Sequence, residues 1–183
     1  MKTLYNSSQD LYTSDYGHKN IYRKRWFRID KTKPLADFLI EVSWEVCNKV
    51  GGIYTVLMSK AARMLDYYDG HYLLIGPYFA NKTAGVFLEE MPPPQIKKAL
   101  EQLKEENIEA HYGKWLIQGE PKVILIDFSQ QFSKVNDIKK WLWDNYQVDS
   151  LRASFDYDEP VVWSICTGKA IEQLAASFGN KTV

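Results

Sequence analysis

Cysteine and histidine are scarce in this sequence, and their scarcity narrows the kinds of site that it can hold. The two cysteines, Cys47 and Cys166, are too few for a disulfide framework, so we expect a protein of the reducing cytoplasm. The three histidines, His18, His71 and His111, have no partners at metal-ligand spacing. We therefore predict structural roles for the histidines and no metal site.

The sequence also lacks an excess of either charge and any long apolar run. It holds 23 basic and 23 acidic side chains, so the composition gives no argument for a nucleic-acid partner. No apolar run approaches the roughly 20 residues of a membrane span. Residues 1–10 lack the apolar core of a signal peptide. We expect neither a membrane nor a nucleic acid as partner.

Charge is nevertheless distributed unevenly along the chain. Residues 1–34 carry eight Lys or Arg and three Asp, a net charge of +5, and the first twenty residues are polar without a period. We predict a basic, poorly ordered arm over residues 1–34, followed by one domain over residues 35–183. Basic and aromatic residues alternate over 23–28, as in some nucleic-acid or polysaccharide contacts. A solvated arm, or one docked on a neighbouring subunit, is the simpler interpretation.

Residues 38–65 contain a strand, a glycine loop and a helix in succession. The apolar run at residues 38–40 has the length of a buried strand, and paired glycines follow at 51 and 52. From residue 53 onward, apolar residues recur at the three-and-four spacing of a helix face. The predicted face consists of Ile53, Val56, Leu57, Ala61, Met64 and Leu65.

This arrangement suits a phosphate. The first turn of a helix has amides without partners and a partial positive charge. Gly51 and Gly52 leave room for a ligand at those amides and tolerate positive φ, and Lys49 adds an ammonium. The alternative is a strand-to-helix turn that needs two glycines for its geometry, with Lys49 solvated.

Strand and helix patterns alternate through the rest of the domain. This alternation predicts an α/β fold of Rossmann-like type, a mostly parallel sheet with helices on both faces. The expected strands cover residues 71–76, 108–112, 115–117 and 123–126, and the expected helices follow Pro92–Pro94, run near residues 132–146 and start around Glu159-Pro160.

Residues 41–57, EVSWEVCNKVGGIYTVL, closely resemble the N-terminal signature of glycogen synthases of the animal and fungal type. Three further blocks follow in the family's order: LIGP at 74–77, YGKWLIQG at 112–119 and PKVILID at 121–127. The resemblance runs from about Asp37 to the end of the chain. It implies the N-terminal Rossmann-like domain of a retaining GT-B glycosyltransferase, in which two such domains face each other across a cleft.

The family transfers glucose from a nucleotide-diphosphate glucose to the nonreducing 4-hydroxyl of an α-1,4-glucan with retention. The resemblance therefore implies a glucan acceptor, UDP- or ADP-glucose as donor, and no metal or other cofactor. It assigns donor phosphate binding to Lys49, Gly51 and Gly52, with Lys49 as the catalytic residue that meets the charge on the leaving group. Homo-oligomerisation of the full-length protein stays open.

Two acidic positions invite other assignments. Asp156-Tyr157-Asp158 has the D-x-D spacing of metal-dependent transferases, but it precedes a helix, where Asp158 and Glu159 suit a cap and a first turn. The resemblance places Asp158 and Glu159 near the cleft as candidates for binding the acceptor, although the family has Asn-Asp at this pair. Asp127 ends a strand, and we expect it to cap the next turn through Ser129.

Two residues within the blocks that match the family have simpler interpretations. Cys47 has no base nearby in sequence and is interpreted as a small apolar filler. Trp115 could stack on a sugar, but Leu116 and Ile117 beside it favour core packing.

The family's catalytic histidine segment is expected beyond Val183, so we expect a chain truncated before it and inactive alone. Two alternatives from other classes remain at this point. One is a noncatalytic glucan-binding module. The other is the nucleotide-binding Rossmann domain of another enzyme, such as a nicotinamide-dependent oxidoreductase, although the chain lacks G-x-G-x-x-G.

Overall fold

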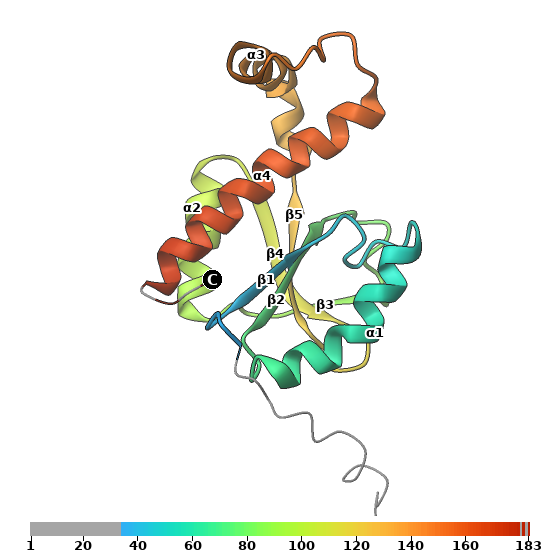
Figure 1. Ribbon diagram of the computed structural model, residues 1–183, viewed down its shortest axis with the longest axis vertical. Helices are drawn as coiled ribbons and strands as arrows, with labels where there is room; N and C mark the ends of the chain where they lie inside the picture. The colour runs from blue at the N-terminus through green and yellow to red at the C-terminus, as the bar shows by residue number, and fades with distance from the viewer. Residues whose placement is uncertain (1–33, 180, 182) are drawn as a thin grey trace, which may run out of the picture. The chain divides into compact units, whose positions relative to one another are not determined.

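The computed structural model describes residues 34–179 together with Lys181 and Val183 (Figure 1). The predicted arm lies outside the described residues except for Pro34. In chain order the elements are β1 (Leu39–Val42), α1 (Gly52–Tyr67), β2 (Tyr72–Pro77), β3 (Phe87–Glu89), α2 (Pro94–Glu105), β4 (Glu109–Trp115), β5 (Lys122–Asp127), the 3₁₀ helix η2 (Ser129–Lys134), α3 (Val135–Tyr146) and α4 (Phe155–Phe178).

The five strands form one mixed sheet in the order β1-β2-β5-β4-β3. The three neighbours β1, β2 and β5 are parallel, whereas β4 pairs with β5, and β3 with β4, in antiparallel orientation. The connection from β4 to β5 is too short for a crossover helix, which explains their antiparallel pairing. The prediction of an α/β fold is confirmed. The parallel part of the sheet consists of β1, β2 and β5.

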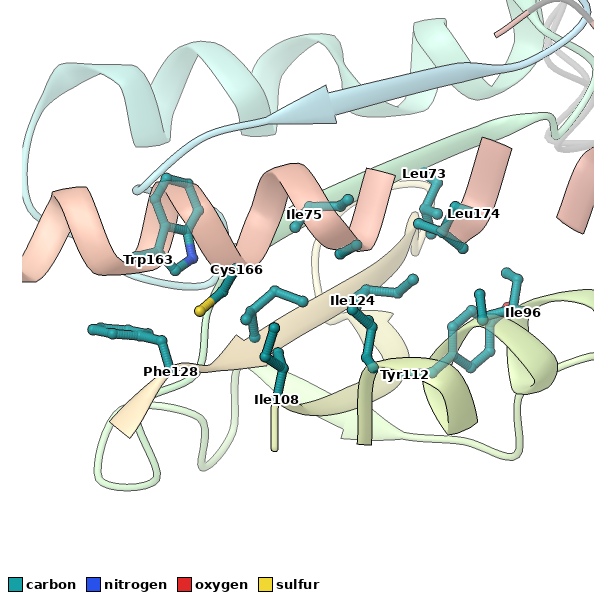
Figure 2. Packing of buried hydrophobic residues seen from close by; sticks show 14 of the residues in the cluster. Leu73, Ile75, Ile96, Ile108, Tyr112, Ile124, Phe128, Trp163, Cys166 and Leu174 are labelled. Atoms are coloured by element: carbon teal, nitrogen blue, oxygen red, sulfur yellow. The ribbon is translucent and has the colours of Figure 1, made fainter. Parts of the chain in front are cut away.

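Helices cover both faces of the sheet, as the alternation of patterns predicts. Leu73 and Ile75 of β2 pack into a core with residues of α2 and α4, and Figure 2 shows this core at close range. Tyr72 and Leu74 point to the opposite face, where Leu57 of α1 joins them. Successive side chains of a strand alternate between faces, so a strand buried on both sides is apolar throughout.

The predicted face of α1 is only partly correct. Leu57 and Ala61 are buried against the sheet, as expected. Ile53 and Val56 are 55% and 56% exposed, because the first turns of α1 extend beyond the apolar core. The periodicity of apolar residues therefore identified the helix but not the limits of its buried part.

Helix α4 begins earlier than predicted. Ser154 is its N-cap residue, and the amides of Tyr157 and Asp158 donate to the Ser154 carbonyl at 3.0 and 3.2 Å. Pro160 is therefore not the first helical residue but lies inside the helix. Proline is common at the first position of a helix because it has no amide to donate to a carbonyl four residues earlier. Pro160 lies further inside α4, so this preference predicted the wrong start of the helix.

Two strand assignments also needed correction. Strand β4 contains most of the piece expected at residues 108–112 and continues to Trp115. The strand expected at 115–117 is wrong, because Leu116 and Ile117 lie beyond the end of β4, and the short strand β3 had no pattern that predicted it. Gly113 allows the close pairing, because a Cβ there would lie 2.1 Å from the Leu88 carbonyl oxygen of β3. The helix expected near residues 132–146 is present as η2 followed by α3.

Candidate functional site

The carboxyl ends of β1, β2 and β5 meet at one edge of the sheet because these strands are parallel (Figure 1). The loop over residues 43–51 leaves β1 there, the loop over 78–86 leaves β2, and Asp127 ends β5. Ligands of open α/β sheets bind at this edge. The predicted residues Lys49, Gly51 and Gly52 all lie in or directly after the first loop.

The 43–51 loop lies directly on the end of β2. The Ser43 amide donates to the Ile75 carbonyl at 3.1 Å. A Cβ on Gly76 would lie 2.6 Å from the Val46 carbonyl oxygen, a distance that real side chains essentially never show. Glycine at this point of β2 is therefore required for the close approach of the loop.

Glu45 occupies part of the predicted anion site. Its Oε2 accepts hydrogen bonds from the amides of Gly51 at 2.8 Å and Tyr54 at 2.9 Å, so a carboxylate from six residues upstream caps α1. Gly51 has φ of −147°, and neither loop glycine is in the positive-φ region, so the tolerance of glycine for positive φ is not used in this loop. Glycine at position 51 instead allows the Glu45 carboxylate to lie close to the backbone, because a Cβ there would lie 3.1 Å from Glu45 Oε1.

The rest of the predicted site is open. Nothing lies within 4 Å of a Cβ built on Gly52, and Lys49 is exposed. In the described part of the chain the amides of Gly52 and Ile53 have no acceptor, and no carboxylate lies within 4.0 Å of the Lys49 ammonium. Phosphate binding by Lys49, Gly51 and Gly52 stays a prediction. The Gly51 amide is the one member of that set with an acceptor of its own.

The adjoining loop supplies a lysine that the sequence patterns did not suggest. Lys82 Nζ donates to Asn48 Oδ1 at 2.9 Å, and Asn48 Nδ2 donates to the Trp44 carbonyl at 3.0 Å. Asn48 is 1% exposed, so both of its polar groups are fixed inside the loop. No spacing rule links residues 48 and 82, and none places a capping side chain six residues before the N-cap of a helix, so only the folded chain identifies Glu45 and Lys82.

The acidic candidates have partners within the chain. Asp127 Oδ1 accepts the Ser129 amide at 2.9 Å, which confirms its predicted role as a cap. Asp158 forms an ion pair with Lys139 of α3 at 2.6 Å, with the two side chains 16% and 5% exposed. Glu159 is half-buried. Acceptor binding by Asp158 and Glu159 stays a prediction, and for Asp158 it would compete with this ion pair.

The remaining candidates have packing roles. His111 stacks on Tyr78 at 3.8 Å between ring centroids and lies 3.0 Å from Glu89 Oε1. Trp115 is fully buried, as expected for a core residue. Burial raises the pKa of the Cys47 thiol to about 12, so it remains protonated and suits the filler role. Among the residues that the structure describes, no group of three His, Cys, Asp or Glu is arranged for a metal ion.

Comparison with known proteins agrees with the order of motifs along the chain. The model of the glycogen synthase family matches residues 41–182, which include the whole sheet except the first two residues of β1. The chain belongs to the glycogen synthase family. Members of this family are glycosyltransferases, so the family is one of enzymes and not of noncatalytic binding modules.

Curated relatives from distant organisms carry the same family name. Glycogen (starch) synthase of Dictyostelium discoideum is 35% identical over 143 residues, 78% of this chain. The liver enzyme of Rattus norvegicus is 39% identical over 117 residues, 62% of the chain, and the Neurospora crassa enzyme is 36% identical over 127 residues, 68% of the chain. The matched region spans 16 to 18% of the length of these relatives.

Membrane insertion of a helix has no support in the described residues. None of their helices has both the length and the apolar composition that crossing a bilayer would require.

Proposed function

We propose that this glycogen synthase domain serves transfer of glucose from a nucleotide-diphosphate glucose to the nonreducing 4-hydroxyl of an α-1,4-glucan, with retention. In this proposal it is the N-terminal, acceptor-side domain of a cytoplasmic enzyme of GT-B architecture. UDP- or ADP-glucose is the donor, and no resident cofactor takes part. The observation that carries the proposal is the open amino terminus of α1, with Lys49 beside it, at the carboxyl edge of the parallel strands.

The chemistry needs positive charge at the leaving group. In the transfer, the bond between glucose C1 and the diphosphate oxygen breaks, a bond from C1 to the acceptor oxygen forms, and the hydroxyl proton is released. The departing nucleoside diphosphate gains negative charge. Donors that are already fixed stabilise this charge in the transition state without reorganising. We assign this role to the Lys49 ammonium and the amides of Gly52 and Ile53, with Glu45 holding the Gly51 amide.

The test is glucose incorporation into glycogen by the complete gene product that contains these residues. Lys49→Ala removes the ammonium, and we expect kcat to fall by roughly two orders of magnitude, the usual effect of losing one donor to a developing anion. Lys98→Ala removes an exposed lysine on α2 and should leave kcat unchanged. A Lys49→Ala enzyme with nearly normal kcat would contradict the assignment.

A further inference from the structure

Lys82 lies in the loop that leaves β2 and is held over the loop that leads into α1. Its ammonium donates to Asn48 Oδ1 at 2.9 Å and lies 4.9 Å from the centroid of the Phe79 ring. The Lys82 amide also donates to the Phe79 carbonyl at 2.8 Å, which closes a turn and fixes the base of the side chain. Contacts therefore hold both the backbone and the ammonium end of Lys82 in place.

Asn48, the anchor of Lys82, lies in the same loop as Lys49 and Gly51 of the predicted phosphate site. Asn48 is buried and directly precedes Lys49, and only three residues lie between it and Gly52. Consecutive Cα atoms are about 3.8 Å apart, so the anchor lies within roughly 15 Å of the open helix amides along the chain. Asn48 Oδ1 accepts one of the three N–H groups of the Lys82 ammonium, and the described residues supply no acceptor for the other two.

The partners of Lys82 are neutral. Most lysines of the domain with a fixed partner face a carboxylate; examples are Lys60 with Glu41 and Lys139 with Asp158. Within the described residues, no carboxylate lies within 4.0 Å of the Lys82 ammonium. An amide oxygen and a ring face hold an ammonium without neutralising it. The described residues therefore supply no counterion to Lys82 at the carboxyl edge of the parallel strands.

The cap on α1 explains why a second cation is useful. Glu45 uses two of the first amides of the helix and places a negative charge beside them. Lys49 alone would offset that charge and leave no net positive charge for a diphosphate. With Lys82 included, the charges of Glu45, Lys49 and Lys82 sum to +1 before a ligand binds. The open amides at the start of α1 add the partial positive charge of the helix dipole.

We propose that Lys82 is a second phosphate-binding cation of the donor site, anchored by Asn48 to contact the diphosphate together with Lys49. This assignment rests on the proposed function. A purely structural role, in which Lys82 joins the two loops, is the alternative. The two roles differ because a phosphate contact discriminates between nucleoside diphosphate and monophosphate, whereas a loop contact does not.

The test measures inhibition of the complete gene product by UDP and UMP, or by ADP and AMP if the donor is ADP-glucose. Lys82→Met removes the charge and keeps an apolar stem. We expect its inhibition constant for the diphosphate to rise roughly tenfold, while that for the monophosphate changes less than twofold. Lys82→Arg should stay within a few-fold of the wild type, and Lys98→Met is the matched control.

Lys82→Gln is a second uncharged variant, to be measured if Lys82→Met does not fold. Equal weakening of diphosphate and monophosphate, or no change in either, would overturn the role of Lys82. If Lys49→Ala loses activity while the Lys82 variants behave as wild type, only this inference fails. If the wild-type protein neither transfers glucose nor binds the diphosphate, the proposed function fails together with it.

Discussion

The Glu45 side chain determines which amides at the start of α1 are open to a ligand. The paired glycines indicated an anion site at the start of α1, and the structure places an internal anion on the amides of Gly51 and Tyr54. The carboxylate satisfies two of the four orphan amides of the helix and complements its dipole. The remaining amides of this turn, on Gly52 and Ile53, are the ones open to a ligand.

Removing this cap should lower the stability of the domain. We expect Glu45→Ala to reduce the free energy of unfolding by about 1 to 2 kcal/mol, because the exposed Gly51 amide and the partly buried Tyr54 amide lose their acceptor. Glu45→Gln keeps an acceptor oxygen and should lose less. Urea unfolding of the 183-residue chain measures both, with Glu105→Ala on the exposed side of α2 as control. Equal stability of Glu45→Ala and the wild type would show that water replaces the cap at no cost.

At the scale of elements, helices α3 and α4 are joined by a buried charge pair. Lys139 is 5% exposed and Asp158 is 16% exposed, and their polar atoms lie 2.6 Å apart. The next residue, Lys140, pairs with Asp144 at 2.5 Å within α3, but that pair is exposed. Both pairs join a lysine to an aspartate, and they differ in burial and in position, because one links two helices and the other lies within one helix.

We expect Lys139→Ala to destabilise the chain by about 3 kcal/mol, because it leaves the Asp158 carboxylate buried without its cation. Lys140→Ala should change the free energy of unfolding by less than about 0.5 kcal/mol. Thermal unfolding of the single variants and of Lys139→Ala with Asp158→Asn gives the coupling between the two residues. A coupling near zero would mean that water already solvates this pair.

At the scale of the whole domain, the sheet and the candidate site are one packing unit. Gly76 lies in β2, between two parallel neighbours, and the loop that carries Lys49 passes directly over it. Two cores, one on each face of the sheet, hold β2 in place. Displacement of the 43–51 loop and loss of sheet stability should therefore occur together.

Gly76→Ala tests this coupling. Its Cβ would lie 2.6 Å from the Val46 carbonyl oxygen, so the loop must move, and we expect a loss of about 3 kcal/mol. Gly52→Ala meets nothing within 4 Å, and its free energy of unfolding should change by less than about 0.5 kcal/mol. Urea unfolding measures both variants. If both were tolerated equally, the close approach of the loop would not be required for the fold.

Much of the fold could be predicted because its signals are local. The apolar runs of β2 and β5, the glycine turn before α1 and the alternation of patterns gave the α/β class and helices on both faces, and the family motifs agreed with the family match. Asp127 as a cap was also predictable, since its acceptor and donor are two residues apart. The predictions failed where tertiary packing overrides a local sequence pattern, as at Pro160 inside α4 and at the exposed Ile53 of α1.

The sequence by itself determined the family, the class of fold and the position of the glycine loop, because each depends on residues adjacent along the chain. The tertiary structure alone decided which amides of that loop are open, which charges are paired and which lysine joins the site. Contacts between Glu45 and Tyr54, Lys82 and Asn48, or Lys139 and Asp158 form only when separate elements pack, and short-range periodicity carries no record of them.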